Sequence, residues 1–111
     1  MTTTAKADKI HLLNDRLRKT FTGGRVVTSA VVAALGETLK TRVLMMVREF
    51  TDFTEDNDPH KEHDCFLFDL EGERYAVKID YYDKSMEFGS EDPSDPEQTT
   101  RVMTIMLASD M

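Results

Sequence analysis

Five residues that could bind a metal ion or take part in acid–base chemistry lie within eight positions of one another. They are Asp58, His60, His63, Asp64 and Cys65. Imidazole, carboxylate and thiolate groups are the side chains that bind zinc and other transition metals in proteins. The pattern makes four of the five a candidate metal site: Asp58, His60, His63 and Asp64. The corresponding enzyme would be a metal-dependent hydrolase with Asp80 as its base.

The spacing of these residues argues against that site. Structural zinc usually takes its ligands from two separated elements, whereas these residues belong to one short segment. The order His-x-x-His-Asp also lacks the helical His-Glu-x-x-His register, which aims two imidazoles at one ion. The structural alternative is that His63 and Asp64 bond the loop backbone at the entry to a hairpin. We therefore expect no cofactor and favour a non-catalytic protein.

Cys65 is the only cysteine, so it forms no disulfide within the chain. His60 and His63 lie too close to it in sequence to serve readily as the base of a cysteine nucleophile. No secretion signal opens the sequence, and no apolar run approaches the roughly 18 residues of a membrane span. These features predict a cytoplasmic protein that does not enter the membrane.

Acidic residues are concentrated in the second part of the chain. Met1–Phe50 carries nine basic and four acidic residues, net +5, whereas Thr51–Met111 carries five and 17, net −12. Such a surface complements a basic protein or nucleoprotein complex and disfavours direct binding to nucleic acid. The candidate partner-binding carboxylates are Asp52, Glu55, Asp56, Asp58, Glu91, Asp92, Asp95 and Glu97. The alternative is that these charges only keep a small domain in solution.

Two amphipathic stripes predict the first helices. The first stripe consists of Ile10, Leu13, Leu17 and Phe21, with Lys9, Arg16, Arg18 and Lys19 at other positions. Gly23-Gly24 is typical of a cap at the end of this helix. A second helix is predicted from Glu37 to about Phe50. Between the two helices, Arg25–Ser29 predicts a strand, and we assign Ala30–Leu35 to a turn.

Alternation with a period of two predicts a β-meander. Phe66, Phe68 and Leu70 share one face of a first strand, and Tyr75, Val77, Ile79 and Tyr81 share one face of a second. Glu71-Gly72 supplies the turn between them. A third, short strand is predicted at Ser85–Phe88. Asp95 and Pro96 then predict the start of a third helix, because Asp is a good N-cap and Pro suits the first helical position.

These segments predict a single α+β domain over residues 1–111. Three helices are expected to pack on one face of a small three- to four-stranded antiparallel sheet. Residues 1–6 are expected to be disordered, and 51–64 and 89–95 to form acidic loops.

Several sequence blocks together resemble one bacterial family of small proteins that is classified as a domain of unknown function. The blocks are Phe21-Thr22-Gly23-Gly24-Arg25-Val26-Val27, Asn57-Asp58-Pro59 with Glu62-His63-Asp64, Lys78-Ile79-Asp80-Tyr81-Tyr82-Asp83, Glu87-Phe88-Gly89-Ser90, and Thr100-Arg101-Val102-Met103-Thr104-Ile105-Met106-Leu107-Ala108. That family is often encoded on plasmids and other mobile elements. The resemblance therefore implies a small accessory protein of a mobile element, some of which counter host defences. An acidic interaction protein that inhibits a nucleic-acid-handling defence complex is the expected function.

Overall fold

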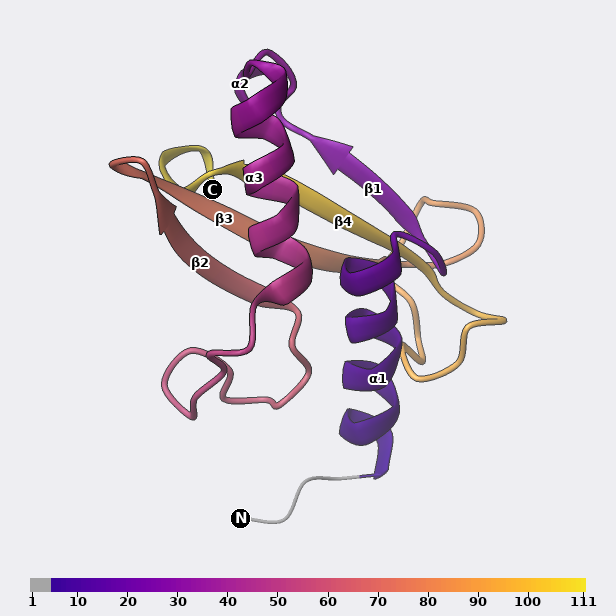
Figure 1. The fold of residues 1–111 in the computed structure, drawn as a ribbon. Helices are drawn as coiled ribbons and strands as arrows, with labels where there is room; N and C mark the ends of the chain where they lie inside the picture. The colour runs from indigo at the N-terminus through magenta and orange to yellow at the C-terminus, as the bar shows by residue number, and fades with distance from the viewer. Residues whose placement is uncertain (1–4) are drawn as a thin grey trace.

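The structure, a computed structural model, describes residues 5–111 and has an α+β fold (Figure 1). Its elements in chain order are α1 (Ala5–Thr20), β1 (Arg25–Thr28), α2 (Ala30–Ala33), α3 (Glu37–Glu49), β2 (Cys65–Leu70), β3 (Glu73–Tyr82), β4 (Thr100–Leu107) and the short 3₁₀ helix η1 (Ala108–Asp110). Of the residues predicted to be disordered, 1–4 lie outside the described part. Ala5 and Lys6 begin α1.

The four strands form one sheet in the order β1-β4-β3-β2. β2 and β3 pair antiparallel, as do β3 and β4, whereas β1 pairs parallel with β4. The prediction of a purely antiparallel sheet is therefore wrong. Parallel neighbours need a crossover connection. Here the chain between β1 and β4 includes two helices and the β2–β3 hairpin, which gives it ample length to return in the same direction.

The prediction of a third helix after Pro96 is also wrong, because this segment contains the central strand β4. Asp95 does accept a hydrogen bond from Glu97 N at 2.9 Å, but the turn that it starts ends at Gln98. The residues that follow are rich in β-branched Thr, Val and Ile, which favour a strand. They also alternate, with Arg101, Met103 and Ile105 buried. Both a helical and a strand periodicity fit this segment, and it forms a strand because β4 pairs with β1 on one edge and with β3 on the other.

The predicted strand at Ser85–Phe88 is a turn, with a single bridge between Tyr82 and Gly89. Asp83 Oδ1 accepts hydrogen bonds from Glu87 N at 3.2 Å and Phe88 N at 3.4 Å. Ser85 Oγ donates to the same oxygen at 2.7 Å. Local side-chain acceptors of this kind satisfy backbone amides that a sheet ladder would otherwise use.

The helices cover one face of the sheet (Figure 1). The predicted alternation is confirmed, since Phe66, Phe68, Tyr75, Val77 and Ile79 belong to the core under the helices. The helical core residues are Leu17, Val32, Val43 and Val47. Val32 lies in α2, which replaces the predicted turn and begins where Ser29 Oγ accepts a hydrogen bond from Val32 N at 3.3 Å.

The hairpin turn between β2 and β3 is confirmed at Glu71-Gly72. Both residues have positive φ, 53° and 79°. This is the combination that a two-residue type I′ turn requires, because its twist matches that of the flanking strands. Leu70 and Glu73 close the ladder on either side of the turn.

The connection from α1 to β1 passes close to β4. Phe21, with φ 57°, ends the helix, so the left-handed residue that follows Thr20 is not the predicted glycine. Gly23 (φ 86°) turns the chain, and Gly24 then lies against β4. A Cβ on Gly24 would lie 2.7 Å from the Arg101 carbonyl oxygen, a distance that only a backbone shift could relieve.

We predict that Gly24→Ser lowers the free energy of unfolding by about 1–3 kcal/mol, because the added atoms overpack the α1–β4 contact. Urea denaturation monitored by circular dichroism measures the change. Gly36→Ser is the matched control, since a Cβ there meets nothing within 4 Å and Gly36 is the N-cap of α3. A serine cap should stabilise by a few tenths of a kcal/mol. Equal stability of the two variants would contradict the close approach.

Candidate functional site

The inner side of α1 carries buried polar side chains beside its apolar stripe. Asn14 is fully buried and Arg18 is 1% exposed, although Arg18 was expected outside the stripe. His11 and Asp15 lie on the same helix and are half-buried. α1 therefore places one guanidinium, one imidazole, one carboxylate and one amide against the rest of the protein.

Arg18 is a buried cation with a carboxylate partner. Its Nε donates to Asp15 Oδ1 at 2.9 Å, one helical turn away. A terminal nitrogen donates to the carbonyl oxygens of Val47 at 3.3 Å and Arg48 at 3.4 Å, at the end of α3. The guanidinium also lies over the Phe53 ring, 5.2 Å from its centroid. Arg18 thus fixes α1 to α3 and to the loop that follows.

His63 lies between two carboxylates from different segments. Its Nδ1 is 3.1 Å from both oxygens of Asp15, and its Nε2 is 3.5 Å from Asp58 Oδ2. The ring stacks on Phe53 with centroids 3.9 Å apart. An imidazolium carries a hydrogen on each nitrogen and can donate to both carboxylates.

The loop between α3 and β2 is folded around Asp58. Asp58 is 5% exposed, and its Oδ1 accepts a hydrogen bond from His63 N at 3.2 Å. Lys61 and His63 have positive φ, 58° and 56°, so the chain turns sharply enough to bring the ring back to the carboxylate. Because Asp58 is buried and bonded to His63, its carboxylate does not belong to the exposed acidic surface.

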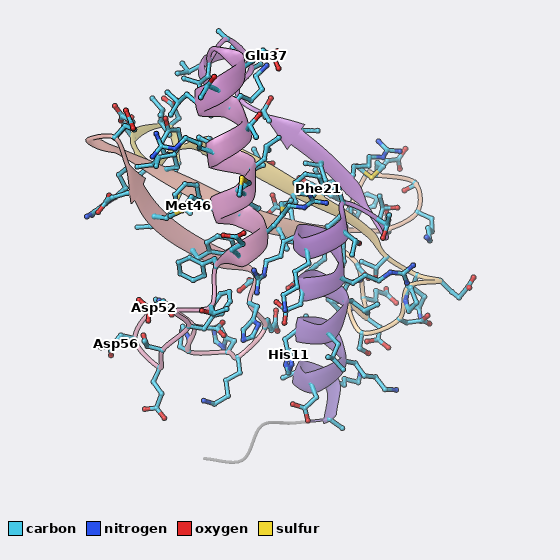
Figure 2. All side chains as sticks on the ribbon, in the orientation of Figure 1. His11, Phe21, Glu37, Met46, Asp52 and Asp56 are labelled. Carbon is cyan, nitrogen blue, oxygen red and sulfur yellow. The ribbon has the colours of Figure 1, made fainter. Side chains whose placement is uncertain are left out.

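A cavity of about 420 Å³ lies between α1 and this loop, and its polar lining includes His11, Glu55, Asp58, Lys61 and His63. The His11 and His63 rings lie 4.8 Å apart. Figure 2 shows His11 on the side of α1 that faces the loop. A general base needs an unshared nitrogen within reach of a substrate proton. Both nitrogens of His63 face carboxylates instead, so the geometry favours a structural role for this ring.

A second polar network lies deeper, around Asn14. Its amide nitrogen donates to Tyr81 Oη at 2.8 Å and to the Glu62 carbonyl oxygen at 2.9 Å, and its oxygen accepts from Arg101 Nε at 2.9 Å. Tyr81 donates to Glu62 Oε1 at 2.8 Å. Burial raises the pKa of Tyr81 well above its usual value, so the hydroxyl keeps its proton and remains a donor.

The four predicted metal ligands do not form one cluster. The structure brings Asp58 and His63 together, whereas no described hydrogen bond or ion pair joins His60 or Asp64 to them. Within residues 5–111, no group of three or more His, Cys, Asp or Glu side chains could hold a metal ion. The Asp64 carbonyl oxygen accepts from Ile79 N at 2.7 Å at the hairpin entry, a main-chain bond that does not involve the carboxylate.

Asp64 and Cys65 are partly desolvated at the start of β2. Burial is the main cause that raises the pKa of each, and Glu62 raises that of Asp64 further. Asp64 in turn adds to the rise at Cys65. A raised pKa reduces the thiolate fraction of Cys65 and hence its reactivity as a nucleophile.

The acidic candidates occupy two loops on opposite sides of α1 (Figure 1). Asp52, Glu55 and Asp56 are exposed in the loop 51–64, and Glu91 and Glu97 are exposed in the segment 83–99. Asp92 and Asp95 are half-buried. Hydrogen bonds from Ser94 and Gln98, respectively, are the main causes that lower the pKa of these two groups. Lys6 forms an ion pair with Asp92 at 3.8 Å.

Sequence reasoning missed His11, Asn14, Asp15 and Arg101. Helical spacing gave one signal, since Asn14 lies four residues after Ile10 and three before Leu17 and therefore belongs to the apolar stripe. Strand periodicity gave a second signal, because Arg101 shares the period-two spacing of Met103 and Ile105. Nothing in the sequence indicated that Asp15 would meet His63.

We predict that Asp15→Asn lowers the free energy of unfolding by about 2–3 kcal/mol, because it leaves the buried Arg18 without a countercharge. Denaturant unfolding at pH 7 measures this change. Asp8→Asn, on the exposed face of the same helix, alters the net charge equally and should change stability by less than about 0.5 kcal/mol. Similar losses in both variants would argue that net charge and not the Arg18 contact is responsible.

We predict that Asp64→Asn stabilises the protein at pH 7. A carboxyl group whose pKa is raised on folding binds its proton more tightly in the folded chain, so it costs stability as pH rises above its ordinary value of 3.8. The gain from Asp64→Asn should therefore shrink as pH is lowered from 7 toward 4. Thermal melts across this range, with exposed Asp56→Asn as the charge-matched control, measure the effect. A gain that grows on acidification would refute the assignment.

The described part of the chain contains no helix with the length and apolar character needed to cross a membrane. A search of curated proteins and a search of solved structures give no significant match. Residues 27–110, which include β1 from Val27 onward and all later elements described, match the model of a protein family. The chain therefore belongs to the family described as Protein of unknown function (DUF3768).

Proposed function

We propose that the protein is a non-catalytic interaction protein whose loop 51–64 presents carboxylates to a basic partner. The observation that carries this proposal is the exposure of three acidic side chains and their lack of ion pairs. Asp52, Glu55 and Asp56 are exposed within five positions, and none forms an ion pair with a cation of residues 5–111. Figure 2 shows Asp52 and Asp56 on the part of the loop away from α1.

The backbone that carries these carboxylates is held by its own hydrogen bonds. Asn57 Oδ1 accepts from Thr54 N at 2.7 Å, and Thr54 Oγ1 accepts from Asn57 N at 3.2 Å. Asn57 Nδ2 also donates to the Asp52 carbonyl oxygen at 2.8 Å. A loop fixed before binding loses less conformational entropy on association, so its charges contribute more to affinity.

A partner rich in Lys and Arg fits this surface by electrostatic complementarity, which accelerates association and becomes weaker as salt increases. The resemblance to small accessory proteins of mobile elements favours a nucleic-acid-handling complex of a host defence system as that partner. Inhibition would follow if the carboxylates occupy the groove in which the complex binds phosphates. The unpaired Cys65 fits a reducing cytoplasm as the place of action.

We predict that neutralising Asp52, Glu55 and Asp56 together, to Asn or Gln, abolishes capture of the basic partner from host lysate at low salt. Two other triple variants serve as controls because they change the net charge equally. One neutralises Glu37, Glu49 and Asp110 on other surfaces, and the other neutralises Glu91, Asp92 and Glu97 in the second acidic loop. Mass spectrometry identifies the partner, and the purified pair gives the association rate as a function of salt. The proposal fails if the first triple variant binds like the wild type, or if only nucleic acid is captured.

A further inference from the structure

Arg101 is a buried cation without a carboxylate partner. Its side chain donates to Asn14 Oδ1 and to the Pro93 carbonyl oxygen, both of which are neutral acceptors. It is 2% exposed, and no carboxylate in the described part of the chain forms an ion pair with it. Arg18 is equally buried but has Asp15 beside it. Burying a charge without a countercharge is unfavourable, so Arg101 needs a further explanation.

The surroundings of Arg101 reduce this cost only partly. Its guanidinium lies over the Tyr81 ring, 5.2 Å from the centroid. The carboxylate of Glu62 forms no ion pair with it; hydrogen bonds through Tyr81 and Asn14 connect the two groups, and the negative charge of Glu62 partly opposes the effect of burial on the pKa of Arg101. Burial lowers the pKa of Arg101, the direction expected when the charged form is incompletely compensated.

Arg101 also lines a cavity of about 340 Å³ at the end of α1, separate from the one that contains His63. Arg16 from α1 and Lys84 from the loop after β3 line the same cavity, and its lining includes no carboxylate. Three cationic residues therefore line one partly open cavity in a protein with a net charge of −7. Local charge of this kind attracts anions despite the opposite sign of the whole molecule.

The remaining lining residues are uncharged. Gly23 and Gly24 are among them, and a Cβ on Gly23 would lie 3.9 Å from Arg16 Nε, so this turn lies beside the Arg16 guanidinium. Thr100, the residue before Arg101 in β4, also belongs to the lining. Guanidinium groups bind phosphate oxygens through paired donors, and such charge-assisted hydrogen bonds are among the strongest in proteins.

We propose that this cavity binds the phosphoryl group of a small molecule, either free phosphate or a phosphate monoester, through Arg101, Arg16 and Lys84. The volume is near the lower end of ligand pockets, about 300–1,000 Å³, which suits a small metabolite better than a polymer. This site is separate from the acidic loop 51–64, because no residue of that loop lines the cavity.

Isothermal titration of the full chain at constant ionic strength tests the proposal with ribose 5-phosphate, inorganic phosphate and ribose. Saturable binding of one of the phosphates, with no binding of ribose, is the expected result. Inorganic phosphate equal to or tighter than the sugar phosphate identifies free phosphate as the ligand, whereas tighter binding of ribose 5-phosphate identifies a monoester.

Exposed residues supply the decisive variants, because Arg101 substitutions could prevent folding. Arg16→Gln and Lys84→Gln should each weaken phosphate binding by about tenfold, as expected for the loss of one charge-assisted contact. Lys19→Gln removes the same charge from α1 outside the cavity and should change affinity by less than about twofold. Circular dichroism confirms that each variant folds. No saturable binding, an equal loss in Lys19→Gln, or binding of single-stranded oligonucleotide alone would overturn the proposal.

Discussion

One buried amide, that of Asn14, connects three parts of the protein that are far apart in sequence. Its hydrogen bonds reach the loop before β2, the end of β3 and the start of β4. Each bond satisfies a group that has little or no access to water, and a buried donor or acceptor left unpaired costs about 1–3 kcal/mol. α1 can therefore occupy only one rotation and one height against the sheet. Asp15 and Arg18 follow from this position, since they lie one residue and one turn further along the helix.

The roles of the charged residues depend more on their burial than on their position in the sequence. Two arginines lie beneath the surface of an acidic molecule, and one of them is matched by Asp15. Several carboxylates shape turns: Asp83 and Asp95 accept backbone hydrogen bonds within their own loops. Others compensate cations, as Asp92 does for Lys6. The acidic excess that can face a partner is therefore smaller than composition suggests, and the loop 51–64 contributes three neighbouring carboxylates to it, Asp52, Glu55 and Asp56.

The amino-acid pattern was sufficient to predict a helix or a strand wherever the apolar residues fitted only one of the two periodicities. Alternation placed β2 and β3 with the correct inner faces, and the stripe of Val43 and Val47 placed α3. It failed for β4, where Val102, Ile105 and Met106 fit a helix as well as the alternating residues fit a strand. There the deciding interaction was with β1 and β3, which local sequence does not contain. The buried polar contacts could not be predicted from the sequence for the same reason, because each joins residues from different segments.

The central position of β4 has a consequence for how the sheet folds. β1 and β3 are adjacent to β4 in the sheet but not to each other, and β4 follows the other three strands in the chain. The four-stranded sheet therefore cannot form until β4 has paired, whereas the β2–β3 hairpin can form from neighbouring residues alone. Pairing Arg25 with Val102 joins residues 77 positions apart, and contacts of such long range slow folding. Until β4 has paired, the core residues of α1 and α3 lack Met103 and Ile105 as neighbours and are open to association with other chains.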